Sequence, residues 1–231
     1  SVTSVAERLY GIELQSGPFS VAELRLSQAI REYGGTLPGD GMHLYVADTL
    51  EDPSKSSNHE LSYTLQMIAQ QREQANKVKL ESPIQVCIGN PPYMDKAEGM
   101  GGWIEQGYPT ETKAPLDDFR SPGNGKYEYV LKNLYVYFWR WAMWKVFEST
   151  KESPDGLVCF ITAAGYLNGP GFRGMREWIR RNTSHGRIIN LTPEGKRPPA
   201  RTAVFNIETE VAIALFVRKK NNDLNTPAKI K

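Results

Sequence analysis

The stretch Ile84-Gln85-Val86-Cys87-Ile88-Gly89-Asn90-Pro91-Pro92-Tyr93 decides the fold. Its first six residues form a short apolar run of the kind found in buried strands, and two prolines follow almost directly. In open α/β sheets, ligands gather beyond the carboxyl ends of the strands. The sequence therefore predicts a strand over 84–89 and a ligand site at Asn90-Pro91-Pro92-Tyr93.

Strand-like and helix-like segments alternate around this stretch, which is typical of a mostly parallel α/β sheet with helices on both faces. We expect further strands at 9–14, 43–47, 157–162, 187–191 and 210–218, the last two forming an antiparallel pair. We expect helices from Gly17-Pro18 to Gly34-Gly35, and over 59–79, 127–150 and 172–182. One catalytic domain is predicted over 1–220, with an insertion loop at 94–126 and a polar tail at 221–231.

Composition excludes several classes of protein. The 231 residues are 40% apolar and carry a formal net charge of +2, which alone does not indicate nucleic acid. The two cysteines lack the spacing of a zinc site, and the three histidines are too scattered to hold a metal. The most apolar stretch, 133–147, is too short and too charged to cross a membrane. We therefore expect a cytoplasmic protein with reduced core cysteines and no metal.

The charge is distributed unevenly. Residues 173–201 contain eight basic residues against Glu177 and Glu194; they are Arg173, Arg176, Arg180, Arg181, Arg187, Lys196, Arg197 and Arg201. Such a local excess suits a DNA phosphate backbone. A solvated basic helix and loop explains the composition equally well.

The tetrapeptide after the strand suits methylation of an exocyclic amine. The N6 lone pair of adenine is delocalised into the ring and is a poor nucleophile. An Asn90 side-chain oxygen and a carbonyl held by Pro91 and Pro92 can accept both amine hydrogens, which favours a pyramidal nitrogen. Tyr93 offers a flat face on which a flipped base can stack. The alternative, an ordinary Pro-Pro turn with a surface tyrosine, explains less of this pattern.

Two acidic residues end the strands that precede the tetrapeptide. Glu13 closes the strand at 9–14, where an acid commonly holds ribose hydroxyls. Asp48 closes the strand at 43–47, where it can accept from the adenine amine of a cofactor. Acids at strand ends are also common helix N-caps, and each residue taken singly favours that explanation. Together with the tetrapeptide, they favour a ligand.

The order of these segments resembles the N6-adenine DNA methyltransferases of the gamma arrangement. The matching segments are Tyr10-Gly11-Ile12-Glu13-Leu14, Val46-Ala47-Asp48-Thr49-Leu50 and Ile88-Gly89-Asn90-Pro91-Pro92-Tyr93. The resemblance is to the methylase segments of large fused restriction–modification enzymes, and it runs over nearly the whole chain. It implies a Rossmann-like fold, S-adenosyl-L-methionine as cofactor and double-stranded DNA as substrate.

The resemblance also implies roles for individual residues. Ile12, Glu13, Asp48, Thr49 and Asn90 would bind the cofactor, with Glu13 on its ribose and Asp48 on its adenine amine. Asn90, Pro91, Pro92 and Tyr93 would form the catalytic motif. The helix start near Asn133 would flank the cofactor pocket. Phe205 would pack against the flipped base, and the basic residues Arg197 and Arg201 would contact DNA.

The sequence departs from this family at its beginning. The glycine-rich loop that follows the family's first strand has no counterpart in residues 1–231. We therefore expect an N-terminally truncated sheet, without its first strand and glycine loop, that binds cofactor poorly alone. Nuclease, helicase and target-recognition domains, fused or associated, are the expected partners, and no membrane is.

Two other functions stay open on the sequence. The same tetrapeptide serves glutamine and RNA N-methyltransferases, whose substrates are also planar amides or amines. A non-catalytic DNA-binding or scaffold module of a defence complex is the alternative of another class. The long insertion after Tyr93 and the basic residues of the C-terminal third favour DNA methylation.

Overall fold

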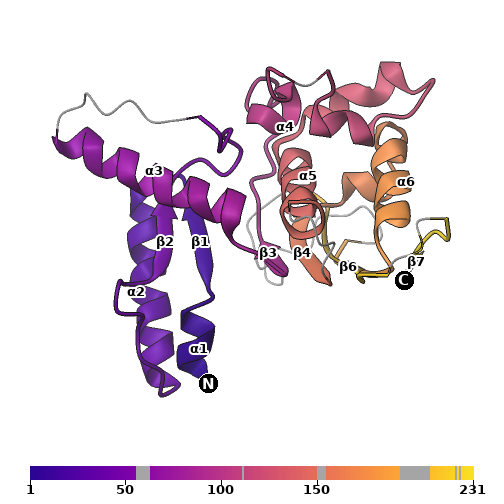
Figure 1. Cartoon of the computed structure of the whole chain (residues 1–231). Helices are drawn as coiled ribbons and strands as arrows, with labels where there is room; N and C mark the ends of the chain where they lie inside the picture. The colour runs from indigo at the N-terminus through magenta and orange to yellow at the C-terminus, as the bar shows by residue number, and fades with distance from the viewer. Residues whose placement is uncertain (56–62, 111, 150–154, 193–208, 222, 224) are drawn as a thin grey trace. The chain divides into compact units, whose positions relative to one another are not determined.

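The computed structural model describes residues 1–55, 63–110, 112–149, 155–192, 209–221, 223 and 225–231. The contacts divide the chain into two compact units, Ser1–Ser82 and Pro83–Lys231. Each unit has its own sheet, and the chain is a mixed α/β protein, as predicted. Figure 1 shows the elements of both units with the labels used below.

The first unit is built on a strand–helix–strand motif. Its elements are α1 (Val2–Ala6), β1 (Tyr10–Glu13), α2 (Ser16–Glu32), β2 (His43–Val46) and α3 (Tyr63–Glu81). Strands β1 and β2 pair in parallel, with Glu13 opposite Val46. Parallel pairing places both carboxyl ends at the same edge of the sheet. The expected positions of these strands are therefore confirmed.

Glycines shape this unit at two points. A Cβ on Gly11 would lie 2.5 Å from Cδ2 of Leu44, so a larger residue there would require the Leu44 side chain to move. Helix α2 ends with Gly34 at φ +74°, and Gly35 N–H donates to the Ile30 carbonyl at 2.8 Å. This is the Schellman ending that the Gly34-Gly35 pair predicts.

The second unit contains a sheet of five strands in the order β3-β4-β6-β5-β7. The strands are β3 (Val86–Gly89), β4 (Gly156–Ala163), β5 (His185–Asn190), β6 (Val211–Arg218) and β7 (Lys229–Ile230). Strands β3 and β4 are parallel, whereas β6 runs antiparallel to both of its neighbours, β4 and β5. The antiparallel pair predicted at the end of the chain is therefore confirmed, and β6 joins it to β4.

Helix α5 (Leu134–Phe147) forms the core of the second unit. Trp139 is fully buried, its ring centroid lies 4.8 Å from that of Phe160 and 5.3 Å from that of Phe216, and Nε1 donates to Thr162 Oγ1 at 3.3 Å. Most of the other aromatic side chains of this helix are buried too. Helix α6 (Arg173–Asn182) buries Ile179. Aromatic side chains all round α5 thus mark a buried helix, as expected.

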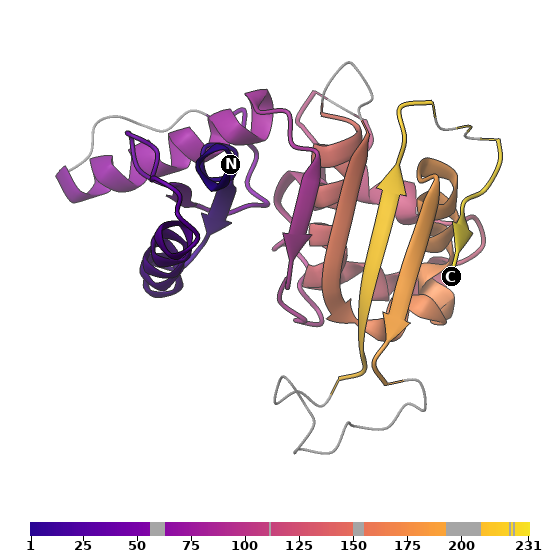
Figure 2. The same cartoon turned by 90° about the horizontal axis from the view of Figure 1, so that it is seen from below.

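The opposite face of this sheet is apolar but open. Ile88 is 74% exposed on β3 and Ile189 59% exposed on β5, and the residues opposite them on the inner strands are also apolar. In Figure 2 the helices of this unit lie behind the sheet. Helices were expected on both faces, but those described in residues 83–231 cover one. Apolar residues on both faces of a strand predict that both faces of the sheet are covered. They do not indicate which segment of the chain covers each face.

The segment predicted as an insertion loop is partly helical and contributes to the core. It contains α4 (Gly102–Gln106) and the 3₁₀ turn η1 (Pro115–Phe119), and the 3₁₀ helix η2 (Gly125–Lys132) begins at its end. Trp103 is 3% exposed and Phe119 is fully buried. These helices are too short to leave a periodic pattern in the sequence, so the glycines and prolines between them dominate its appearance.

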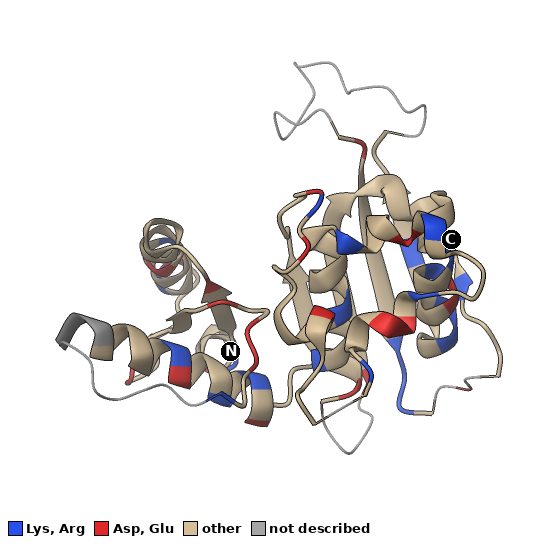
Figure 3. Cartoon of the chain, turned by 90° about the horizontal axis from the view of Figure 1, so that it is seen from above, with Lys and Arg blue, Asp and Glu red and all other residues tan. Residues whose placement is uncertain are grey.

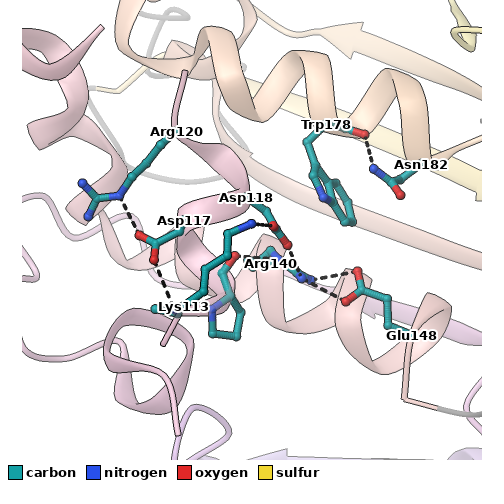
Figure 4. A network of polar contacts seen from close by, with 10 residues as sticks. Lys113, Asp117, Asp118, Arg120, Arg140, Glu148, Trp178 and Asn182 are labelled. Atoms are coloured by element: carbon teal, nitrogen blue, oxygen red, sulfur yellow. Dashed lines mark hydrogen bonds and ion pairs between the residues drawn. The ribbon is translucent and has the colours of Figure 1, made fainter. Parts of the chain in front are cut away.

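A buried arginine holds this segment against the helices. Arg140 of α5 donates to the Pro115 carbonyl at 3.0 Å and to Asp118 at 2.7 Å, and it pairs with both oxygens of Glu148 (Figure 4). Its guanidinium carbon lies 4.8 Å from the ring centroid of Trp178 on α6. One side chain therefore connects η1, α5 and α6.

The last residues are more ordered than a polar tail would be. Strand β7 pairs in parallel with β5, and Ala228 is 3% exposed. The Ile188 N–H donates to the Lys231 carbonyl at 2.8 Å. A two-residue strand among polar residues gives no alternating pattern, which is why the sequence suggests only a tail. The prediction of one catalytic domain over 1–220 stays a prediction.

Candidate active site

The tetrapeptide Asn90–Tyr93 lies where the sequence places it, directly after β3. Because β3 and β4 are parallel neighbours, the turn lies at the carboxyl ends of two strands. Pro91 is buried and anchors the turn, while Asn90 and Pro92 are exposed. The Asn90 amide therefore projects from a fixed backbone towards solvent, as a group that must meet a substrate should.

Tyr93 lies against the amide of Asn90. Its hydroxyl donates to Asn90 Oδ1 at 2.5 Å and lies 3.3 Å from the carbonyl oxygen of Ile161 on β4. Partial burial raises the pKa of Tyr93 above its ordinary value, so the phenol stays protonated and remains a donor at neutral pH. The side-chain oxygen Oδ1 of Asn90 has two lone pairs, so it can accept one hydrogen bond from Tyr93 and a second from a substrate amine.

The segment after Tyr93 runs beside the start of α5. The Leu134 N–H donates to the Met94 carbonyl at 2.9 Å, and the Ala97 N–H donates to the Lys132 carbonyl at 2.7 Å. Asn133 precedes the helix, and its Oδ1 accepts from the Lys96 N–H at 3.4 Å. The start of α5 therefore lies beside the segment that follows the tetrapeptide, and its expected place at the cofactor pocket stays a prediction.

Cys87 does not belong to this site chemically. Burial raises the pKa of its thiol to about 12, so a thiolate nucleophile is not formed at neutral pH.

Among the described residues, no group of three His, Cys, Asp or Glu side chains is arranged to hold a metal ion. No helix in the described part of the chain is long and apolar enough to cross a bilayer.

The acidic residues predicted for the cofactor lie together in the first unit. Glu13 ends β1, and its backbone carbonyl accepts from the Ala47 N–H at 3.0 Å, next to Asp48. Each carboxylate also closes a local turn: Glu13 Oε1 accepts from Gln15 N–H and Asp48 Oδ1 from Leu50 N–H, both at 2.9 Å. Local capping and ligand binding are compatible, because within the described residues neither Glu13 Oε2 nor Asp48 Oδ2 has a donor. Ile12 on β1 and Thr49 are half-buried beside them.

Helix α3 holds the turn that carries Asp48, which the sequence did not indicate. Gln71 Oε1 accepts from the Val46 N–H at 3.4 Å, and Arg72 forms an ion pair with Glu51. Two helical turns further on, Lys79 is 1% exposed and donates to the Asp48 carbonyl at 2.6 Å. Lysines are frequent on the exposed faces of such helices, so the residue type alone does not indicate burial. The one signal in the sequence is that Lys79 lies on the same face of the helix as positions 71 and 75, because these positions are four residues apart.

The residues predicted for base and DNA contact fall mainly outside the described part of the chain. Phe205, Arg197 and Arg201 are among the residues that the structure does not describe, so their roles stay predictions. On α6, Arg173 pairs with Glu177 at 3.0 Å and Arg176 donates to the carbonyls of Tyr166 and Gly169. Figure 3 shows basic residues along this part of the second unit. Part of the basic segment therefore has structural partners.

One cavity in the second unit lies away from the predicted site. It has a volume of about 590 Å³ and is lined by residues of α6, β5 and the C-terminal strand, including Arg176 and Lys229. None of the predicted cofactor or catalytic residues lines it. The cavity therefore does not help to locate the candidate active site, which is identified by the chemistry of its residues and by its place at the strand ends.

Comparison with known proteins identifies the family. The model of the Eco57I restriction-modification methylase family matches residues 7–196, which is most of the chain. A search of curated proteins gave no match.

Three solved structures share the fold at low sequence identity. An ATP-dependent Type ISP restriction-modification enzyme, LlaBIII bound to DNA, gives a TM-score of 0.68 at 22% identity over 96% of this chain. A nuclease-deletion mutant of the Type ISP enzyme LlaGI, in complex with a DNA substrate mimic, gives 0.70 at 20% identity over 100%. The DrdV–DNA complex gives 0.65 at 20% identity over 97%. The present chain spans 14%, 19% and 21% of these three chains, respectively.

Proposed function

The chain belongs to the Eco57I restriction-modification methylase family, and from this premise we propose that it carries the catalytic part of a DNA adenine-N6 methyltransferase. The observation that carries the proposal is the Asn90–Tyr93 turn at the carboxyl ends of two parallel strands. In this proposal the strands belong to a Rossmann-like methyltransferase sheet. The first strand and glycine loop expected ahead of β1 stay a prediction.

Asn90 and the turn around it would activate the adenine amine. The amide oxygen of Asn90 and the backbone carbonyl of Pro91 accept the two N6 hydrogens and keep the nitrogen lone pair out of the ring system. Tyr93 orients the amide through its hydroxyl, which donates to Asn90 Oδ1 at 2.5 Å. Its ring would stack on a base flipped out of the duplex, an interaction that contributes about 1–3 kcal/mol. Methyl transfer to this nitrogen would break the methyl–sulfur bond of the cofactor, with the bonding electrons left on sulfur, and the nitrogen would release one hydrogen as a proton to solvent.

The first unit would hold the adenosine part of the cofactor S-adenosyl-L-methionine. Glu13 and Asp48 fit this group, because each has a carboxylate oxygen without a donor among the described residues. The Glu13 carboxylate would accept from the ribose hydroxyls and Asp48 from the adenine amine, with Ile12 and Thr49 alongside. When bound, the cofactor supplies an electrophilic methyl group on a sulfonium centre.

The proposal extends to partners. Double-stranded DNA is the proposed substrate, and Arg197, Arg201 and Phe205 are proposed to contact it. Proteins of similar fold are restriction-modification enzymes described in complex with DNA. We therefore propose that nuclease, helicase and target-recognition functions act with this chain, on the same polypeptide or on associated ones.

The proposal is tested with the complete gene product that contains these residues. It is incubated with S-adenosyl-L-methionine and unmethylated plasmid DNA, and the DNA is digested to nucleosides. We expect N6-methyladenine from the wild type and from Asn182→Ala, whose side chain donates to Trp178 at the other end of the sheet. Asn90→Ala should lower the rate by at least about a hundredfold, by analogy with loss of one preorganised polar group in an active site.

Other outcomes would redirect the assignment. A different methylated base, or equal rates for wild type and Asn90→Ala, would overturn the proposed reaction. Bound cofactor with methyl transfer to protein or RNA instead of DNA would identify the related N-methyltransferases. Failure of the complete protein to bind cofactor at all would favour a scaffold.

A further inference from the structure

We propose that Lys79 is a positioning residue for the cofactor: its buried side chain fixes the turn that presents Asp48. This inference rests on the proposed role of Asp48 in binding the cofactor adenine. It concerns α3, a helix to which neither the sequence motifs nor the proposed catalytic chemistry assign a function.

The side chain of Lys79 on α3 contacts the turn that carries Asp48. Its Nζ donates to the Asp48 carbonyl at 2.6 Å and to Asn76 Oδ1 at 3.2 Å, and it lies 3.5 Å from the Glu51 carbonyl. The ammonium group has three hydrogens, enough for one to each of these three acceptors. The side chain is 1% exposed, so water does not substitute readily for any of these contacts.

The same turn directs the Asp48 carboxylate outwards. Asp48 is exposed, although its own backbone carbonyl is bound by the buried lysine. The Leu50 N–H donates to Asp48 Oδ1 at 2.9 Å and closes the turn on the other side. Backbone and side chain of Asp48 are thus both restrained, and the remaining carboxylate oxygen is held in one place for a ligand. Without Lys79, the Asp48 carbonyl would keep only the Glu51 N–H at 3.4 Å and the Glu51 carbonyl would lose the ammonium group, so the turn would be held less firmly.

The protonation of Lys79, and with it the hold of Lys79 on the turn, depends on pH near neutrality. Burial lowers the pKa of Lys79 from 10.5 to about 8, even though the carboxylates of Asp48, Glu51 and Asp52 raise it, and Arg72 lowers it further. Below that pH the ammonium form has a hydrogen for each of the three acceptors named above. Above it the amine has two hydrogens and a lone pair that faces carbonyl oxygens. We therefore expect the turn to loosen as pH rises through about 8.

The test measures steady-state DNA methylation by the complete gene product at pH 7 and pH 9. The substitution Lys79→Met keeps the aliphatic length and removes every donor. At pH 7 we expect the KM for S-adenosyl-L-methionine to rise about tenfold, which corresponds to about 1.4 kcal/mol, with kcat and the KM for DNA unchanged. Lys77→Met is the matched control, because Lys77 is exposed on the same helix and its KM should not change.

The pH profile distinguishes positioning from a merely structural role. In the wild type and in Lys77→Met, the cofactor KM should rise between pH 7 and pH 9, whereas in Lys79→Met it should stay high and flat. Equal pH profiles for wild type and Lys79→Met would overturn the proposal. So would a loss confined to kcat. The wild-type profile needs no variant, so it remains a test even where Lys79→Met fails to fold: a cofactor KM that does not rise above pH 8 overturns the inference.

A third variant separates this inference from the function on which it rests. Asp48→Ala should raise the cofactor KM by at least as much as Lys79→Met. If Asp48→Ala raises the KM and Lys79→Met does not, the positioning role is wrong and the cofactor site stands. If Asp48→Ala leaves the KM unchanged, the proposed role of Asp48 is wrong, and the inference about Lys79 falls with it.

Discussion

Tyr93 contributes two separable groups to the proposed site, a ring and a hydroxyl. The ring supplies the surface on which a base can stack, and the hydroxyl orients Asn90 through a hydrogen bond of 2.5 Å. The hydroxyl does not react, because its raised pKa keeps it protonated throughout the neutral range. Substitution can therefore remove one contribution and leave the other.

Tyr93→Phe should lower kcat for DNA methylation by about three- to tenfold, the value of one ordinary hydrogen bond. Tyr93→Ala removes the ring as well and should cost about tenfold more, because stacking on a base contributes about 1–3 kcal/mol. Single-turnover methylation of plasmid DNA by the complete gene product measures both. Equal losses in the two variants would show that the ring is not used.

The sequence predicts the residues of this site unevenly, for a physical reason. Asn90 and Tyr93 can be recognised because a polar residue and two prolines directly after an apolar strand form an unusual local pattern. Glu13 and Asp48 can be placed because Glu13 ends one strand and Asp48 lies just beyond the end of the next. Lys79 could not be found, since its role depends on a contact with Asp48, 31 positions earlier, and α3 has a weak apolar face. Local pattern identifies the groups that face a ligand, but tertiary contacts determine what supports them.

At the scale of elements, Arg140 connects α5 with η1 through hydrogen bonds and with α6 through its contact with Trp178. Its side chain is 4% exposed, whereas those of Asp118 and Glu148 are 24% and 32% exposed. A buried guanidinium bound to two partly hydrated carboxylates and a carbonyl is satisfied only while all its partners stay in place. The stability of η1 therefore depends on a residue of the core helix.

Arg140→Met should lower the free energy of unfolding by about 3 kcal/mol, because it removes the arginine that pairs with Glu148, leaves Asp118 only its ion pair with Lys113, and removes the contact with Trp178. Arg173→Met is the matched control, because it removes a surface ion pair with Glu177 in which the arginine side chain is 66% exposed. That substitution should cost no more than about 0.5 kcal/mol. Urea unfolding followed by tryptophan fluorescence measures both, and equal costs would contradict the role assigned to Arg140.

The elements that the sequence predicts well are those whose ends carry strong signals. Helix α2 is bounded by Pro18 in its first turn and by Gly34-Gly35 at its end, and the structure shows the Schellman hydrogen bonds there. Residues 94–126 give no such signal, because their helices are too short for periodicity and Trp103 and Phe119 are buried singly. Strand β7 also gives no signal in the sequence, because its two residues are too few to show an alternating pattern.

At the scale of the whole molecule, the position of β6 determines the integrity of the second unit. Strand β6 hydrogen-bonds to β4 along eight residue pairs and to β5 along six. No other described strand joins β4 to β5. Strand β7, by contrast, adds only an edge.

Two truncations of the chain test this arrangement. A chain that ends at residue 220 lacks only β7 and its neighbours, and we expect it to melt cooperatively, about 5 °C below the parent. A chain that ends at residue 208 lacks β6, so β5 has no partner on that side and the buried Trp139 loses its contact with Phe216. We expect no cooperative transition in the near-ultraviolet circular dichroism of that chain. Retention of the parent melting temperature after the longer truncation would show that β6 is dispensable.

The order β3-β4-β6-β5 also has a consequence for synthesis on the ribosome. The chain emerges from its N-terminus at about 5–20 residues per second. Strand β5 emerges before β6, the strand that will separate it from β4, so β5 must wait without its inner neighbour until residues 211–218 are made. During that interval β4 offers an unpaired edge to any extended segment nearby, including one from another nascent chain. The interval between the emergence of β4 and that of β6 is therefore the stage of synthesis at which this sheet has an unpaired inner edge.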